Sequence, residues 1–200
     1  RDFFVAFSMP EYQENSRVHS IERLSASFFR ITLQSPLIAT AARPGQFVMA
    51  ACGTTLDPLL RRPFSIHNRT PDGQLQILFR VIGQGTRLLS ESTTGQELSL
   101  IGPLGKGFSL QPGEPVGLIG GGIGMAPLLF LVQALLQANG RGTDCTVFLG
   151  SRTADELSQV AANFITLGCR VETATDDGSS GYHGLVTDLL APQVTRFNKV

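Results

Sequence analysis

The sequence lacks tryptophan, contains only three cysteines and has no excess of either charge. Its 16 Lys and Arg residues balance 16 Asp and Glu residues, so the formal net charge at pH 7 is zero. Neither sign forms a block, and nothing favours binding to nucleic acid or to a charged membrane surface. No apolar run reaches the roughly 18 residues that a membrane-spanning helix needs. These absences indicate a globular chain with neither nucleic acid nor a membrane as its partner.

The three cysteines indicate neither a disulfide nor a metal site. Cys52, Cys145 and Cys169 are widely separated and form no C-x-x-C pair. They predict reduced, buried thiols in a cytoplasmic protein rather than disulfides or metal ligands. The three histidines stand in unlike sequence contexts, so no metal site is expected.

The first half of the sequence is a series of short β-rich runs separated by turn residues. Pro44-Gly45 and Pro71-Asp72-Gly73 supply the fixed and positive φ angles that turns require. A short helix over 86–90 follows Gly83-Gln84-Gly85. Six strands at this spacing predict an antiparallel barrel. The runs are Asn15–Leu24, Phe28–Leu33, Gln46–Ala50, Arg62–His67, Gln74–Val81 and Glu97–Ile101.

A boundary follows at 111–115, where two prolines and a glycine disfavour both helix and strand. It divides the chain into domains 1–112 and 113–200. Beyond it, strands alternate with helices, which predicts right-handed crossovers and a parallel sheet. The strands are expected at 116–119, 146–149 and 170–175, and the helices after Gly124, at 155–167 and at 186–190.

Three strands in the common doubly wound order leave the first strand at an uncovered edge. Parallel strands are normally buried on both sides. We therefore expect this chain to lack the end of its second domain, through truncation, disorder or a partner that covers the edge. Lys199-Val200 would then begin a fourth strand.

A glycine-rich segment, 120–124, separates the strand at 116–119 from the helical pattern that ends near Asn139-Gly140. Glycines let the backbone approach a ligand and aim N–H groups at a phosphate near the positive end of a helix. Pro127 stands where the G-x-G-x-x-G fingerprint has its third glycine. The segment favours a nucleotide-binding loop, and the alternative is a tight strand-to-helix turn.

A second constellation, Arg62-Pro63-Phe64-Ser65, places a cation, a ring and a hydroxyl on one strand. A guanidinium suits phosphate, a ring can stack on a flat ligand, and a hydroxyl can hydrogen-bond a ring nitrogen. Alone, the segment favours solvated arginines beside a core phenylalanine. Phe79-Arg80 and Gly83-Gln84-Gly85-Thr86 add a second cation and a second helix start, and together they predict a pyrophosphate site.

These motifs resemble the ferredoxin–NADP reductase superfamily over nearly the whole chain. Within it, Ile101–Phe108 and especially Thr175–Ser179 followed by Gly184–Asp188 are similar to the electron-transfer subunits of NAD-dependent dihydroorotate dehydrogenases. The resemblance implies a β + α/β fold: an antiparallel FAD-binding barrel followed by a Rossmann-like, parallel-sheet NAD-binding domain that is incomplete at its C-terminus. It also implies a function in pyrimidine biosynthesis, in which electrons from dihydroorotate oxidation in a flavin-containing partner subunit pass through FAD to NAD.

The resemblance further implies which residues bind the cofactors. Phe64 against the flavin ring and Ser65 near its reactive nitrogen are the expected catalytic residues. The FAD residues are Arg62, Pro63, Phe64, Ser65, Leu78, Phe79, Arg80, Gly85 and Thr86. The NAD residues are Gly121, Gly122, Ile123, Gly124, Met125, Ala126, Pro127, Thr175, Asp176 and Asp177. Relatives also bind a [2Fe–2S] cluster through four cysteines near the C-terminus, and this sequence does not contain those cysteines.

The choice of nucleotide stays open on the residues alone. Ser151 and Arg152 follow the second strand of the predicted sheet and are further candidate nucleotide-binding residues. Arginine there favours the 2′-phosphate of NADP, whereas the resemblance favours NAD. We favour NAD, because Arg152 equally suits a solvated position beside Asp155 and Glu156.

The competing functions are another NAD(P)H-dependent flavin or iron–sulfur reductase of the superfamily, and a binding module without catalysis.

Overall fold

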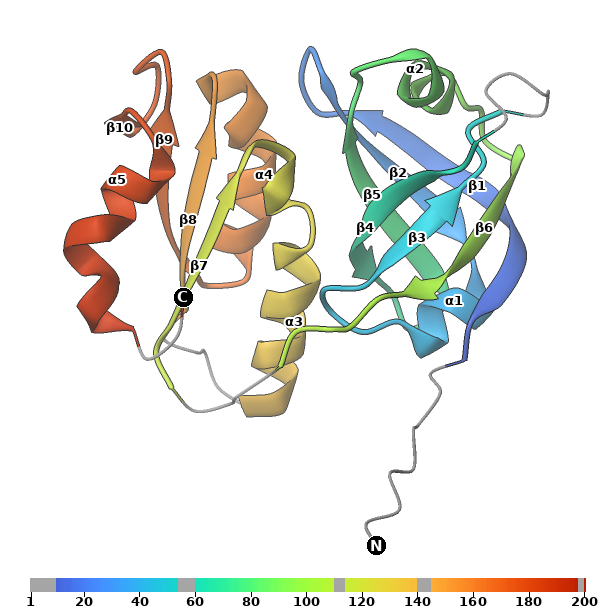
Figure 1. Cartoon of the computed structure of the whole chain (residues 1–200), viewed down its shortest axis with the longest axis horizontal. Helices are drawn as coiled ribbons and strands as arrows, with labels where there is room; N and C mark the ends of the chain where they lie inside the picture. Colours follow the sequence, from blue (N-terminus) through green and yellow to red (C-terminus); the bar gives the residue numbers. More distant parts are fainter. Residues whose placement is uncertain (1–9, 54–59, 110–113, 140–144, 198–199) are drawn as a thin grey trace, which may run out of the picture.

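The computed structural model describes residues 10–53, 60–109, 114–139, 145–197 and 200. Figure 1 shows two lobes side by side, which we call the barrel lobe and the sheet lobe. The barrel lobe comes first in the chain, and the sheet lobe follows. This order confirms the predicted β + α/β architecture.

The barrel lobe contains all six predicted strands, which pair antiparallel and close in the order β1-β2-β5-β4-β3-β6. Its interior is apolar because alternate residues of each strand face inward. Gly45 and Gly73 have φ angles of 90° and 81°, which confirms the two predicted turns. The strands are β1 (Tyr12–Arg23), β2 (Phe28–Gln34), β3 (Phe47–Ala50), β4 (Arg62–Arg69), β5 (Gln74–Arg80) and β6 (Glu97–Leu104).

Two helices accompany the barrel. Helix α2 (Gln84–Ser90) begins two residues before the predicted one. Helix α1 (Pro36–Ala41) was missed in the sequence, although Ser-Pro is a helix-start signal. Its first amides are satisfied from a distant strand, because the Glu14 carboxylate of β1 accepts the N–H groups of Leu37 and Ile38 at 3.2 and 3.1 Å. Such long-range stabilisation leaves no local pattern.

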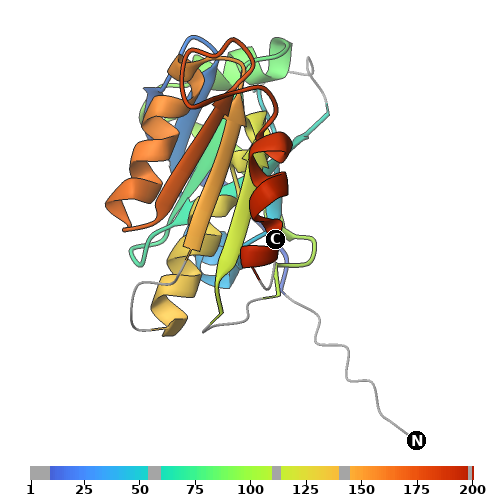
Figure 2. The ribbon, with the colours of Figure 1, turned by 90° about the vertical axis from the view of Figure 1, so that its left-hand side faces the viewer.

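The sheet lobe is a parallel sheet with strand order β10-β9-β8-β7, flanked by helices on both faces. Figure 2 shows α4 on one face and α5 with the following 3-10 helix on the other. The strands are β7 (Val116–Gly121), β8 (Cys145–Ser151), β9 (Arg170–Thr175) and the short, unpredicted β10 (Tyr182–His183). The helices are η1 (Gly122–Met125), α3 (Leu128–Asn139), α4 (Ala154–Thr166), α5 (Val186–Leu190) and η2 (Ala191–Arg196).

Strand β7 lies at an edge of the described sheet and pairs with β8, as expected for the strand that precedes the glycines. That the chain lacks further strands stays a prediction, and Lys199 lies outside the described residues. The predicted boundary at 111–115 falls largely outside them too. The last barrel strand ends at Leu104 and the first sheet strand begins at Val116, so the division at 112/113 also stays a prediction.

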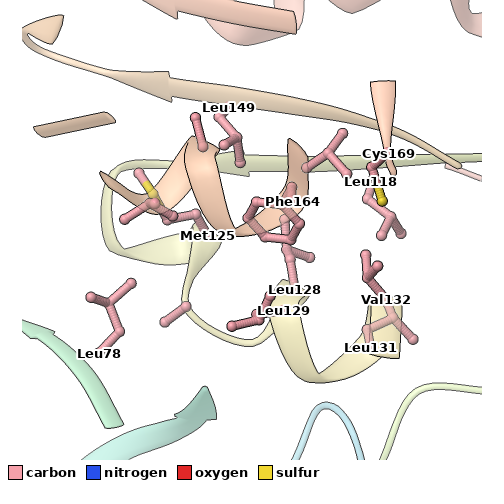
Figure 3. Packing of buried hydrophobic residues seen from close by; sticks show 14 of the residues in the cluster. Leu78, Leu118, Met125, Leu128, Leu129, Leu131, Val132, Leu149, Phe164 and Cys169 are labelled. Carbon is pink, nitrogen blue, oxygen red and sulfur yellow. The ribbon is translucent and has the colours of Figure 1, made fainter. Parts of the chain in front are cut away.

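The two lobes share a hydrophobic core. Leu24, Phe28 and Leu78 of the barrel are buried together with residues of η1, α3, β8 and α4. Figure 3 shows Leu78 reaching from β5 toward Met125 and its neighbours. The apolar contact fixes the barrel against Met125 and Ala126, directly after the glycine-rich segment 120–124. Within the described part of the chain, none of the helices combines the length and apolar character that crossing a membrane requires.

Candidate functional site

The glycine segment forms a tight turn between β7 and α3. A Cβ atom on Gly120 would lie 2.7 Å from the Cα of Met125, so only glycine permits this close approach. Gly122 has a φ of 54°, in the left-handed region. The Cβ positions of Gly122 and Gly124 meet no atom within 4 Å. The turn therefore presents bare, accessible backbone at the start of a helix, which suits an anionic group.

A pocket of about 220 Å³ lies beside this turn. It is at the carboxyl ends of parallel strands, where open α/β sheets bind their ligands. The pocket brings together residues that are far apart in the sequence, including one from the barrel. Its lining includes Arg80, Gly121, Gly122, Ser151, Arg152 and Asp176, all of which the sequence had marked as candidates.

Glu156, which is not among the residues predicted from the sequence, connects the two lobes at this pocket. Its Oε1 atom lies 2.9 Å from an Arg80 nitrogen and accepts the Ser27 hydroxyl at 3.0 Å. Its Oε2 atom accepts the Ser151 hydroxyl at 3.1 Å. The local signal for Glu156 is only an acidic residue in the first turn of a helix. Its proximity to Arg80 comes from the tertiary structure.

Thr175 and Asp177 shape the loop after β9. Thr175 is fully buried, and its hydroxyl donates to the Ser180 carbonyl at 2.9 Å. The Asp177 carboxylate accepts the Ser179 hydroxyl at 2.6 Å and the Ser179 amide, and these bonds lower the pKa of Asp177. Ser179 in turn accepts the Ala154 amide at the start of α4. Of the predicted loop residues only Asp176 lines the pocket, so contacts of Thr175 and Asp177 with a nucleotide stay predictions.

On β4, the predicted flavin residues divide between two faces of the strand. Phe64 is only 8% exposed and meets Phe79 edge-on, with ring centroids 5.9 Å apart, so its ring belongs to the barrel core. Pro63 and Ser65 point to the opposite face, because side chains alternate along a strand. Pro63 is exposed and Ser65 half-buried. Stacking of Phe64 on a flat ligand stays a prediction.

The predicted flavin residues of the neighbouring strand β5 are also distributed between the two faces of their strand. Phe79 is buried in the barrel core, whereas Leu78 joins the core shared with the sheet lobe. Arg80 faces the sheet lobe as well and lies over the Phe28 ring, 5.7 Å from its centroid. Leu78 and Arg80 therefore connect β5 to the pocket side, and Phe79 does not.

Arg62 lies against the start of α2. Its Cγ and Nε atoms are 3.7 Å from the position of a Cβ atom on Gly85, so glycine leaves room for the arginine stem. The guanidinium donates to the Leu60 carbonyl at 3.0 Å, and no carboxylate of the described residues lies within ion-pair distance of it. The amides of Gly85 and Thr86 belong to the first turn of α2, where backbone N–H groups point away from the helix toward a possible ligand. A cation beside these amides has the donor chemistry that a diphosphate needs.

Thr86 already uses its hydroxyl within the turn. The oxygen accepts the amides of Ile82 and Gly83 at 3.0 and 3.2 Å, and the hydroxyl donates to the Gly83 carbonyl at 3.1 Å. The side chain thereby fixes the start of α2. A ligand contact through Thr86 would therefore use its backbone amide.

Comparisons with known proteins support the same architecture. A family model described as oxidoreductase NAD-binding domain matches residues 118–196. A Desulforamulus reducens protein named dihydroorotate dehydrogenase B (NAD(+)), electron transfer subunit, is 44% identical over 179 residues, or 88% of this chain. Proteins with the same name from Lysinibacillus sphaericus and Bacillus caldolyticus are each 36% identical over 93% of it. The chain belongs to this family of dihydroorotate dehydrogenase B electron transfer subunits.

The chain spans 66% of the length of the Desulforamulus relative and 72% of the other two. A solved NADH-dependent reduced ferredoxin-NADP oxidoreductase superposes with a TM-score of 0.76 at 27% identity, covering 90% of this chain and 63% of its own. The Amycolatopsis cytochrome P450 reductase GcoB also reaches 0.76, at 23% identity over 94% and 60%, which shows the fold alone. The family membership and the oxidoreductase domain confirm the expected fold and enzyme class.

Proposed function

We propose that the chain binds FAD at its barrel and NAD at the carboxyl edge of its sheet, and passes electrons between them. By this proposal it is the electron-transfer subunit of a dihydroorotate dehydrogenase of pyrimidine biosynthesis. The observation that supports it most is the pocket that joins Arg80 of the barrel to the open glycine turn and to Ser151 and Asp176. The pocket thus brings one predicted FAD residue, Arg80, next to several of the predicted NAD residues.

The barrel residues present the groups that FAD requires. FAD, when bound, exchanges an electron pair with a nicotinamide as hydride and passes single electrons to other carriers. Arg62 and the amides of Gly85 and Thr86 would hold its diphosphate. Ser65 projects from the face of β4 opposite to Phe64 and would donate a hydrogen bond to the flavin ring. Phe64 supports this strand from within the barrel.

The sheet residues present the groups that a dinucleotide requires. The backbone of Gly122 and Gly124 is open for a diphosphate. Glu156 holds a carboxylate 3.1 Å from the Ser151 hydroxyl, at the end of the second strand. Its oxygens already accept from Arg80, Ser27 and Ser151, so Glu156 would act through its negative charge, which disfavours a 2′-phosphate at this position. This placement supports NAD over NADP.

The partner and the iron–sulfur cluster rest on the family. We infer a catalytic partner subunit because the relatives are named as subunits of dihydroorotate dehydrogenase B. No group of metal-ligating residues occurs in the described ranges, so no cluster ligands are assigned and no electron-transfer step is derived through a cluster. Cys52, Cys145 and Cys169 are free and buried, which supports a reducing compartment such as the cytoplasm.

The first test is the visible spectrum of the anaerobically purified protein, with its released flavin identified. We expect FAD, and we expect NADH to bleach it faster than NADPH does. A preference for NADPH would favour another reductase of the superfamily, which the Ser151-Arg152 pair at the end of β8 also suits. A folded protein that stays colourless after reconstitution with FAD would indicate a binding module.

A further inference from the structure

His67 is a fully buried histidine that connects β4 to the glycine turn. It follows Ser65 by two residues, and its Nδ1 atom lies 2.6 Å from the carbonyl oxygen of Ala126. A carbonyl only accepts, so Nδ1 donates and the tautomer of the imidazole is fixed. Ala126 is held on both sides, since its amide donates to the Ile123 carbonyl at 3.0 Å and closes the turn. The barrel thus holds the residue that ends the turn.

The backbone of β4 is irregular at His67, and this irregularity sets the direction of its side chain. The pairing of β4 with β5 shifts register between Ile66 and Asn68, so His67 occupies an irregular position in the ladder. Bulges of this kind re-aim a side chain and concentrate near active sites. Helix α3, which begins two residues after Ala126, packs against β4. His67 therefore lies where the barrel meets the glycine turn.

The electrostatics keep His67 neutral. The pKa of His67 is lowered to about 4, chiefly by burial; the hydrogen bond to Ala126 acts in the opposite direction, and the charge of Arg30 acts in the same direction as burial. Its Nε2 atom is buried and, among the described residues, has no hydrogen-bond partner. The bond to the turn is therefore the interaction that a neutral imidazole makes here, and no proton relay through Nε2 is formed by the described side chains.

We propose that His67 is a positioning residue for hydride transfer. Its hydrogen bond holds the glycine turn at a fixed place against β4, and so fixes the distance between a nicotinamide nucleotide on the turn and a flavin beside Ser65. The proposal rests on the proposed function. In the direction that is easiest to test, the C4–H bond of NADH breaks, NAD⁺ forms, and the flavin gains the hydrogen with both electrons.

Hydride transfer is sensitive to such a distance. Reacting atoms must approach to about 3–3.5 Å, and a misplacement of about 1 Å can lower the rate roughly 100-fold. Loss of the hydrogen bond should therefore lower the limiting rate of flavin reduction more than it changes FAD content. A residue that only stabilised the fold would lower both together or neither.

The experiment compares His67→Leu with His67→Asn in the FAD-loaded protein. Leucine removes the donor, whereas the asparagine amide can still donate to Ala126. Anaerobic stopped-flow mixing with NADH gives the limiting rate and the apparent Kd, and NADH deuterated at the transferred position gives the isotope effect. We expect His67→Leu to reduce its flavin about 10- to 100-fold more slowly, with unchanged flavin content and potential, and His67→Asn to stay within about threefold of wild type. His19→Leu, at an exposed position of β1, is the matched control.

Equal rates in wild type and His67→Leu would overturn the positioning role, and so would an equal loss in His67→Asn. If wild-type protein held no flavin, the proposed function itself would fail, which distinguishes the two failures. A measurement without variants covers the case in which His67→Leu does not fold. Nitrogen-15 NMR of wild type at pH 7 should show His67 protonated at Nδ1, and protonation at Nε2 would contradict the hydrogen bond.

Discussion

The two halves of the candidate site are built in different ways. The barrel half depends on side chains of a continuous strand motif, with Arg62 against Gly85 and Phe64 anchored in the core. The sheet half depends on bare backbone at Gly122 and Gly124, and on a network around Glu156 that draws residues from both lobes. The barrel half should therefore fail through loss of single side chains. The sheet half should fail when atoms are added to the turn or when its charge changes.

The largest effect should come from pH, through the residue that joins the halves. Folded protein keeps His67 neutral down to about pH 4, whereas the unfolded chain protonates near pH 6.5. The unfolded state binds more protons in this window, so the free energy of unfolding falls as the pH drops from about 6.5 to about 4, by up to about 3 kcal/mol. Urea titrations across this range should show the loss in wild type and a smaller one in His67→Asn. Identical pH dependence in the two proteins would contradict the assignment.

The next effect separates crowded from open glycines in the sheet half. In Gly120→Ala the new Cβ would lie 2.7 Å from a backbone atom of Met125, so the turn must shift. Overpacking of this kind should lower the free energy of unfolding by about 2 kcal/mol. Gly124→Ala is the matched control, because its Cβ meets no atom within 4 Å. Gly124→Ala should unfold within about 0.5 kcal/mol of wild type but bind NAD more weakly in calorimetry. Equal stability of the two variants would contradict the packing of the turn.

A side-chain deletion tests the barrel half. Arg62→Ala should weaken FAD binding about 10- to 30-fold, since a charge-assisted hydrogen bond contributes about 1.5–2 kcal/mol. The unfolding midpoint should change little. Fluorescence quenching of released flavin on reconstitution measures the Kd. Arg61→Ala is the neighbouring control, because Arg61 donates to Ser99 of β6. Equal flavin affinity in wild type and Arg62→Ala would count against the diphosphate site.

The smallest effect concerns the charge at the pocket. Glu156→Gln keeps hydrogen-bonding atoms but removes the carboxylate that lies beside Ser151 and Arg80. The ratio of kcat/KM for NADPH to that for NADH should rise roughly 5- to 10-fold, or about 1 kcal/mol. Asp155→Asn, in the same helical turn, should leave the ratio unchanged. An unchanged ratio in Glu156→Gln would remove the structural support for NAD.

Local patterns in the sequence predicted most of the fold. Apolar alternation and turn residues located the six barrel strands, and the change to strand-helix alternation located the sheet. Helix α1 was missed because its first amides depend on Glu14 of another strand, and β10 because two residues carry no period. The glycine turn could be predicted from the sequence, because glycine is required wherever backbone atoms approach as closely as at Gly120.

The sequence by itself determined the two lobes, their order and the two motifs that mark the candidate cofactor sites, since periodicity and turn chemistry act over a few residues. Only the tertiary structure decided that Glu156 meets Arg80, that His67 holds Ala126, and that Phe64 lies in the core instead of at a surface. Arg80 and Glu156 are 76 positions apart in the sequence, and His67 and Ala126 are 59 positions apart. The first two contacts depend on how one lobe packs against the other, and the burial of Phe64 depends on how the barrel closes. No local pattern encodes either kind of packing.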